Sequence, residues 1–256
     1  MITILAPAYN EEAVIERFVT ELERRLTLNE DHELLIVNDG SRDSTKQILE
    51  DLQTQYPMLR VVHHPHNKGL GAALETGFRA AKGRAIVTMD ADLTHPPEII
   101  QSMIDQLEHA DVCVASRYVK GGGMQDVPWW RVWLSVIANG IFQVCYGTRL
   151  RDITAGFKAY RREAIQAVSI TSSGFDVQLD ITIKLIRNKV RFAEIPYVLK
   201  NREQGESKMR YMKLIPRYAK TMMRLILLRW FGIGAIPPRV LETRIPAATK
   251  IEEIAK

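Results

Sequence analysis

The feature that most constrains the fold is a regular alternation of short β-branched runs with amphipathic segments over the first 116 residues. The runs have strand length, and the segments between them have helical spacing of apolar residues. This alternation predicts a mostly parallel sheet with helices on both faces, because parallel neighbours need a crossover connection. We expect strands at 2–6, 33–38, 59–64, 84–90 and 111–116, and helices at about 11–28, 42–55, 70–82 and 97–109.

Beyond residue 116 the pattern changes. A glycine-rich loop at 120–123 precedes an expected helix at about 129–147. Another helix near 176–189 and a strand near 190–199 follow, without internal repeats. The remaining segments are expected to be a polar loop at 201–210, a basic amphipathic helix at about 212–231 that ends before Pro237-Pro238, and a tail.

Polar motifs follow four of the expected strands, namely PAYNEE, NDGSRDST, DADLTH and SRY. Ligands of parallel sheets bind at the carboxyl ends of the strands, so the motifs predict one binding site along this edge. Period-two spacing at a strand end places the carboxylates of Asp90 and Asp92 on the same side of the chain. Carboxylates combined with phosphate oxygens suit Mg²⁺ or Mn²⁺, although a lone acidic pair is also typical of a solvated turn.

Asp39 follows the second strand, within the segment Asn38-Asp39-Gly40-Ser41. Its carboxylate could accept hydrogen bonds from a base or a ribose. The same residues also form a common turn before a capped helix.

Together these motifs resemble glycosyltransferase family 2, whose members have a GT-A fold and use nucleotide-diphospho-sugars. The matching pieces, in the family's order, are PAYNE, VNDGSRDST, NKGLGAALETGF, MDADLTHPPE, SRY and DITAGFKAYRR. The likeness covers roughly residues 2–210 and is greatest to the family's dolichol-phosphate mannose synthase branch. It implies a donor site formed by Pro7, Ala8, Tyr9, Glu11, Val37, Asp39, Asp90, Ala91, Asp92 and Lys208.

The resemblance also implies that Asp90 and Asp92 bind the divalent metal and the donor diphosphate. Where relatives carry Gln two residues after the second Asp, this chain has Thr94, a shorter neutral oxygen and a candidate third ligand. The expected division is a catalytic domain at 1–210, with a donor half of about 1–116 and an acceptor half of about 117–210, a membrane-contact helix at 211–236 and a tail at 237–256.

The helix expected at 129–147 has two interpretations. Its apolar residues fall on one face, while Arg131, Ser135, Asn139 and Gln143 repeat on another. This pattern is typical of a core helix with a solvated side. Its three tryptophans equally favour a helix at a membrane surface. In that case Arg117, Arg131 and Ser135 would hold an acceptor phosphate, and Asp92, Arg117 and Arg131 would be the catalytic residues.

Basic charge is concentrated near the C-terminus. Residues 200–229 contain nine basic and two acidic residues, whereas the whole chain carries +5. A basic amphipathic helix predicts contact with an anionic membrane surface, or an ordinary solvated helix. Arg202 and Lys208 lie in a loop that resembles the family's acceptor loop, so Arg202 is a candidate acceptor ligand. Few aromatic residues accompany the basic stripe, so we expect no nucleic acid.

The expected reaction follows from the acceptor. A phosphate monoester has a second pKa of about 6, so it is a nucleophile without a strong protein base. The resemblance favours inverting transfer of mannose from GDP-mannose to a polyprenyl or dolichyl phosphate. We expect this at the cytoplasmic face of a membrane, where the protein is peripheral or has an anchoring partner subunit. The alternatives are UDP-glucose as donor, or a soluble transferase whose glycan or protein hydroxyl acceptor needs a base, for which Asp152 and Asp180 are candidates.

Overall fold

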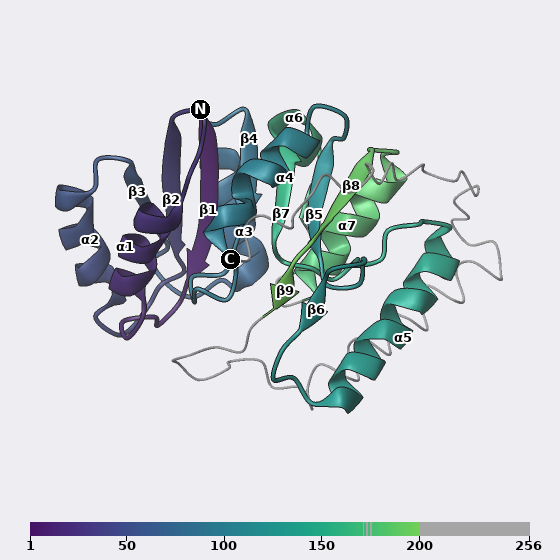
Figure 1. Cartoon of the computed structure of the whole chain (residues 1–256). Coiled ribbons are helices and arrows are strands. Elements are labelled where there is room, and N and C mark those ends of the chain that lie inside the picture. The colour runs from purple at the N-terminus through teal and green to yellow at the C-terminus, as the bar shows by residue number, and fades with distance from the viewer. Residues whose placement is uncertain (171, 173, 175, 200–256) are drawn as a thin grey trace.

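The computed structural model describes residues 1–170, 172, 174 and 176–199, and its centre is a seven-stranded sheet of order β3-β2-β1-β4-β7-β5-β8 (Figure 1). Neighbouring strands are parallel, except that β7 runs antiparallel to both β4 and β5. The mostly parallel sheet expected from the sequence is therefore confirmed. The strands are β1 (Ile2–Ala8), β2 (His32–Asn38), β3 (Leu59–His63), β4 (Ala85–Thr88), β5 (Val112–Ser116), β7 (Lys158–Arg161) and β8 (Phe192–Pro196).

Helices cover both faces of this sheet, as the alternation predicted. Their apolar stripes enter two separate core clusters, one on each side of the strands. One face carries α1 (Ile15–Arg25), α2 (Thr45–Gln55) and α4 (Ile100–Gln106), which follows a 3-10 turn at Pro97–Ile99. The other face carries α3 (Leu70–Ala80), α6 (Arg162–Gln166) and α7 (Val177–Arg187). The sheet edge therefore remains available for the loops that carry the sequence motifs.

Several details of the secondary structure differ from the prediction. The strand expected at 84–90 ends at Thr88, so Asp90 and Asp92 lie in the following turn. The strand expected at 190–199 is divided into β8 and β9 (Val198–Leu199). β9 pairs with β6 (Gly123–Met124), which begins in the expected glycine-rich loop. β7 and α6 were not predicted, because their residues lie inside the DITAGFKAYRR motif and show no clear periodicity.

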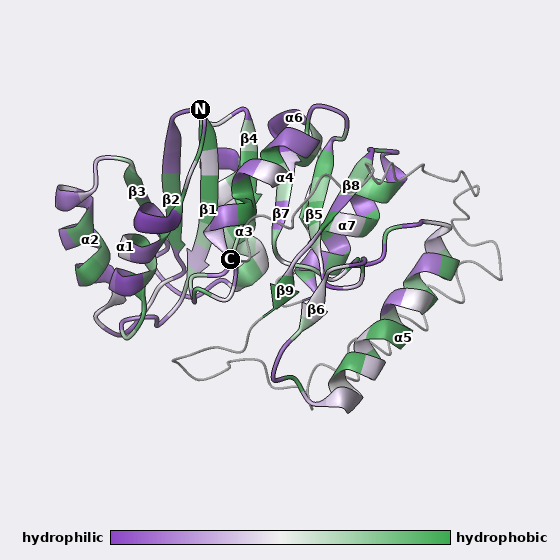
Figure 2. Cartoon of the chain, viewed as in Figure 1, coloured by the Kyte–Doolittle hydropathy of each residue, from purple (hydrophilic) through white to green (hydrophobic). Residues whose placement is uncertain are grey.

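The helix α5 (Trp129–Tyr146) lies at the side of the molecule, away from the layers that cover the sheet (Figure 1). Its polar residues face the protein, since Asn139 is only 3% exposed, and its buried aromatic residue is Phe142. Many of its other apolar residues point outward, with Trp133 61% and Val144 70% exposed. Apolar positions recur along the whole helix in Figure 2. The expected solvated polar side is therefore wrong, because Asn139 is buried, whereas Phe142 joins the core as a core helix requires.

Helix length and composition show whether a described helix could cross a membrane. Within residues 1–199, apart from the three positions left out, no helix is both long enough and apolar enough to cross a bilayer. The predicted loop at 201–210, with Arg202 and Lys208, lies outside the described residues, as do the predicted helix at 211–236 and the tail at 237–256.

Candidate active site

The carboxyl ends of β1 and β2 form one side of the candidate site. The two strands are in register there, and Pro7 pairs with Val37. The loops that follow are joined by hydrogen bonds between backbone and side chain. The Asn10 N–H donates to Ser41 Oγ at 2.9 Å, and the Glu11 N–H donates to Thr45 Oγ1 at 2.8 Å. The PAYNEE and NDGSRDST motifs are thus parts of a single surface, as their place at one sheet edge predicted.

Asp39 is buried at this edge and holds a neighbouring loop in place. Its Oδ1 accepts from His64 Nδ1 at 2.6 Å and from the Lys68 N–H at 2.9 Å. Its Oδ2 accepts from the Gly69 N–H at 2.8 Å. Gly69 has a φ of 92°, a conformation that glycine adopts readily, and it begins helix α3. Asp39 therefore positions the start of α3, and its contact with a nucleotide stays a prediction.

The acidic turn after β4 is organised by its own side chains. Asp92 Oδ1 accepts from the Thr94 N–H at 3.0 Å and from Thr94 Oγ1 at 2.6 Å. The Asp90 N–H donates to His95 Nδ1 at 3.0 Å, and Asp90 is exposed. Because β4 ends at Thr88, this turn sets the positions of the two carboxylates. The alternation of side chains along a strand, on which the prediction was based, does not set these positions.

His95 was missed by the sequence reasoning, although it lies within the quoted MDADLTHPPE motif. Its ring stacks on Phe157, with centroids 4.7 Å apart and planes 15° apart. Phe157 belongs to the DITAGF segment and is completely buried. The stacked pair therefore fixes the acidic turn against a segment distant in sequence. The signal available in the sequence was the presence of both residues in the motifs that carry the resemblance.

The acidic turn fits a divalent cation that is shared with a phosphate ligand. In the described part of the chain, no group of three or more His, Cys, Asp or Glu side chains is placed to hold a metal. Asp90 and Asp92 would supply two hard oxygens, and Mg²⁺ is commonly held by one or two carboxylates plus substrate phosphates. Thr94 Oγ1 donates to Asp92, so within this structure it orients that carboxylate.

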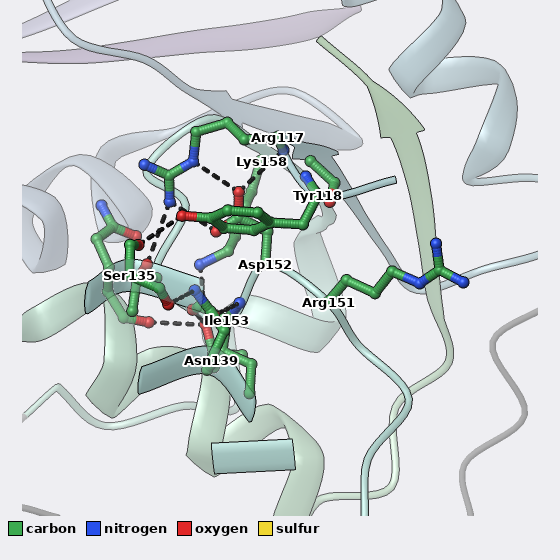
Figure 3. Close-up of polar contacts among 12 residues, drawn as sticks. Arg117, Tyr118, Ser135, Asn139, Arg151, Asp152, Ile153 and Lys158 are labelled. Atoms are coloured by element: carbon green, nitrogen blue, oxygen red, sulfur yellow. Dashed lines mark hydrogen bonds and ion pairs between the residues drawn. The ribbon is translucent and has the colours of Figure 1, made fainter. Parts of the chain in front are cut away.

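Across the sheet edge, Arg117 follows β5 and is paired with Asp152 (Figure 3). Arg117 Nε and Nη2 each lie 2.7 Å from a different Asp152 oxygen, and the Arg117 N–H also donates to Asp152 at 3.0 Å. Burial disfavours the guanidinium charge, but the Asp152 carboxylate outweighs this and raises the pKa of Arg117. Nε and Nη2 have partners, and Nη2 also reaches Thr154 Oγ1. No described residue hydrogen-bonds Nη1.

Neither carboxylate considered as a base is available for that role. Asp152 is fully buried and is neutralised by Arg117. Asp180 accepts from Lys184 Nζ at 2.7 Å on helix α7. A general base must reach the proton that it removes, so the geometry offers no support for either carboxylate in this role.

Lys158 of β7 is a buried cation behind this ion pair. Its Nζ donates to Thr182 Oγ1 at 2.8 Å, and the side chain is fully buried. Burial lowers the pKa of Lys158 to about 7, although the Asp152 charge opposes this effect. Lys158 therefore contributes a cation whose charge depends on pH close to neutrality.

Hydrogen bonds connect α5 to the residues that directly follow Arg117 and Asp152 in the chain (Figure 3). Tyr118 Oη donates to Ser135 Oγ at 2.5 Å, and the Ile153 N–H donates to Asn139 Oδ1 at 2.8 Å. Ser135 is thus near Arg117, as predicted. Arg131 lies on the same helix, and its side chain is outside the described part of the structure.

A cleft of about 690 Å³ opens beside these residues. It is lined by Tyr118, by the α5 residues Asn139 and Gln143, and by Arg149 and Arg151. The Arg151 side chain points away from Asp152 in Figure 3. The two exposed arginines were not among the predicted site residues, and they add positive charge to the acceptor half.

A family model described as Glycosyl transferase family 2 matches residues 3–169, which is more than half of the chain. The chain belongs to this family. The match includes both the acidic turn and the Arg117–Asp152 pair, so both sides of the candidate site lie inside the glycosyltransferase domain.

Curated relatives of this glycosyltransferase share about a third of its residues. A dolichol-phosphate mannosyltransferase of Pyrococcus furiosus is 34% identical over 90% of the chain, which spans 64% of that relative's length. A polyprenol monophosphomannose synthase of Mycolicibacterium smegmatis is 35% identical over 80% of each chain. An undecaprenyl-phosphate mannosyltransferase of Micrococcus luteus is 34% identical, over 82% of this chain and 87% of the relative.

Solved structures support the fold of the glycosyltransferase. Glucosyl-3-phosphoglycerate synthase from Mycobacterium tuberculosis, in complex with Mn²⁺, UDP and glucosyl-3-phosphoglycerate, has a TM-score of 0.65. It is 20% identical, and the match covers 90% of this chain and 79% of the other. A complex of the same enzyme with Mg²⁺ and UDP has a TM-score of 0.63 at 19% identity. At these identities the likeness establishes the GT-A arrangement alone.

Proposed function

We propose that this glycosyltransferase moves a sugar, mannose from GDP-mannose, onto the phosphate of a polyprenyl or dolichyl lipid. The names of three curated relatives support a polyprenyl phosphate acceptor and mannose transfer. The glucosyl-3-phosphoglycerate synthase complexes contain UDP, so UDP-glucose is the second donor to be tested.

The observation that carries the proposal is the arrangement of Arg117. Its guanidinium is held from behind by Asp152, and Nη1 has no hydrogen-bond partner among the described residues. A cation with one open nitrogen suits an anionic acceptor, to which charge-assisted hydrogen bonds are short and strong. A phosphate dianion attacks without a protein base, which agrees with the occupied states of Asp152 and Asp180. Among the described residues, no comparable group supports a hydroxyl acceptor.

On the donor side, Asp90 and Asp92 would hold Mg²⁺ or Mn²⁺ together with the donor diphosphate. The metal, when bound, would stabilise the charge that develops on the departing nucleoside diphosphate. Thr94 keeps the Asp92 carboxylate oriented for this purpose. Attack by the acceptor phosphate from the opposite side of the anomeric carbon would invert its configuration. The nucleotide would lie along the ends of β1 and β2, at Pro7, Ala8, Tyr9, Glu11, Val37, Asp39 and Ala91.

We further propose that α5 contacts a membrane surface. Its exposed face carries Trp129, Trp133 and Val144, while its polar face is bonded to the acceptor side of the site. Tryptophan is favoured at the interface between lipid and water. This orientation brings the site close to a lipid phosphate. An anionic leaflet, a cytoplasmic location and an anchoring partner subunit belong to the same proposal.

The experiment that tests the function is a transfer assay with the full chain. GDP-mannose and UDP-glucose are each offered with a short polyprenyl phosphate, with Mn²⁺ and with a chelator. We expect transfer from GDP-mannose that depends on the metal, and none to the matched polyprenol, which lacks the phosphate. Equal transfer to the polyprenol would contradict the phosphate acceptor.

A further inference from the structure

Tyr197 lies between the donor and acceptor sides of the candidate site. It joins β8 to β9, and its N–H donates to the Ser116 carbonyl at 3.2 Å. Ser116 directly precedes Arg117 in the chain. The Tyr197 carbonyl accepts from the Gly123 N–H at 3.1 Å, so the backbone is fixed on both sides. The position of Tyr197 is therefore set by the same strand end that presents Arg117.

The ring of Tyr197 extends toward the acidic turn. It meets His95 edge to face, with centroids 5.9 Å apart, and meets Phe157 in the same way at 5.9 Å. His95 is the residue whose Nδ1 accepts the Asp90 N–H. Tyr197 therefore connects the turn that carries the donor carboxylates with the strand end that carries the acceptor arginine.

The phenol is protonated at this position. Burial raises the pKa of Tyr197, and the negative charges of Asp152, Asp90 and Asp92 raise it further, whereas Arg117 lowers it. The net direction is upward, so the hydroxyl is a hydrogen-bond donor at neutral pH. Charged groups from both sides of the site therefore influence the pKa of this one phenol.

The Tyr197 hydroxyl has no hydrogen-bond partner among the described residues, although the residue is only 6% exposed. Buried tyrosine hydroxyls usually find a partner. In the same site Tyr118, for example, donates to Ser135 Oγ. A hydroxyl donor that bonds no described residue, on a mostly buried tyrosine near carboxylates and an arginine, is suited to an anionic ligand.

We infer that Tyr197 is a catalytic residue whose hydroxyl donates a hydrogen bond to a phosphate oxygen between donor and acceptor. The inference rests on the proposed function, because that reaction brings two phosphate groups together here. The phosphate belongs either to the departing nucleoside diphosphate or to the acceptor monoester. The hydrogen bond has the same chemistry in both cases. The two cases differ in whether the nucleoside diphosphate or the acceptor monoester loses affinity when the hydroxyl is removed.

The test is Tyr197→Phe in the full chain, because phenylalanine keeps the ring against His95 and Phe157 and removes one oxygen. A hydrogen bond to a charged group contributes about 1.5–3 kcal/mol, so kcat/KM for transfer should fall about 10- to 150-fold. Tyr56→Phe is the matched control, because its hydroxyl contacts Thr20 at 3.3 Å near the end of α2. The control should retain full activity.

Two binding measurements identify the phosphate. Weaker calorimetric binding of GDP with Mn²⁺ to Tyr197→Phe assigns the contact to the donor diphosphate. Unchanged GDP binding with a raised KM for polyprenyl phosphate, or a lowered kcat alone, assigns it to the acceptor phosphate. Wild-type kcat/KM together with wild-type GDP affinity would overturn the inference.

Failure of the proposed function is a separate outcome. If the wild-type chain does not transfer sugar to any polyprenyl phosphate, the proposed acceptor is wrong, whatever Tyr197 does. The inference is then decided by GDP binding with Mn²⁺, where weaker binding to Tyr197→Phe supports it and equal binding overturns it.

Discussion

Arg117 and Asp152 approach each other through two parallel hydrogen bonds of 2.7 Å, and the Asp152 carboxylate is fully buried. A third bond, from the Arg117 N–H, ties the backbone of the same arginine to the same carboxylate. The orientation of the Arg117 guanidinium therefore depends on Asp152. Asp152, which touches no substrate in the proposed reaction, thus orients Arg117, which does.

Replacing Asp152 with Asn should reduce both stability and acceptor recognition. Breaking a buried ion pair by removing one charge commonly costs about 3–5 kcal/mol, because the other charge is left uncompensated. We expect a lower unfolding midpoint in denaturant and a raised KM for polyprenyl phosphate, with unchanged affinity for GDP and Mn²⁺. Asp180→Asn is the control, since its partner Lys184 is partly exposed and such a pair contributes about 0–1 kcal/mol. An unchanged acceptor KM in Asp152→Asn would contradict the positioning role.

Lys158 should make the stability depend on pH. Its pKa is about 7 in the folded chain, whereas the ordinary pKa of a lysine is 10.5. Between these values the unfolded chain holds a proton that the folded chain has released, so the free energy of unfolding rises with pH. The slope is up to about 1.4 kcal/mol per pH unit. Lys158→Met removes this contribution, so the variant should gain most relative to wild type at pH 7 and below. Urea unfolding from pH 6 to 9 measures the difference, and parallel pH profiles would contradict it.

Asp92→Asn should abolish donor binding that depends on the metal. The substitution removes a charged oxygen from the acidic turn and keeps a carbonyl that can still accept from Thr94. Calorimetry with GDP, with and without Mn²⁺, measures the effect. Asp105→Asn on the exposed side of α4 is the control and should bind as wild type does. Equal Mn²⁺-dependent affinity in Asp92→Asn would disprove this metal assignment.

Trp133→Ala should weaken binding to lipid vesicles. The side chain is 61% exposed on the outer face of α5, so its loss removes apolar contact with a bilayer while leaving the protein core intact. Co-sedimentation with anionic vesicles should decrease, and Trp133→Phe should retain most of the binding. Wild-type binding should also fall as salt is added. Absence of binding by the wild-type chain to vesicles of every composition would favour a soluble acceptor.

The sequence predicted those parts of the molecule that repeat a local pattern. The parallel strands and their helices were recognised because each has its own periodicity within a short window. β7 was missed because it is four residues long and begins with Lys158, whose burial depends on Thr182 of a later helix. A local sequence pattern cannot show a contact between residues that are distant in the chain. Tyr197 was missed for the same reason, because its contacts with His95 and Phe157 are also distant in sequence.

Two predictions had the right residues and the wrong geometry. Asp90 and Asp92 were expected at a strand end, but Thr88 ends β4 and donates to the Gly156 carbonyl at 2.8 Å. The bounds of α5 were nearly correct, yet the composition of its faces could not show which face lies inward. Asn139 faces the protein because its partner, the Ile153 N–H, lies in another segment of the chain.

The position of β7 also has a consequence for the order of assembly. β3, β2, β1 and β4 derive from the first 88 residues, so this part of the sheet can form as the chain leaves the ribosome. β5 cannot join it at that stage, because β7 lies between β4 and β5 and is made about forty residues later. Pairings between distant segments form slowly. The sheet edge formed by β1 and β2 should therefore take shape first, and the Arg117–Asp152 pair should form only when residues 158–161 close the gap between the two groups of strands.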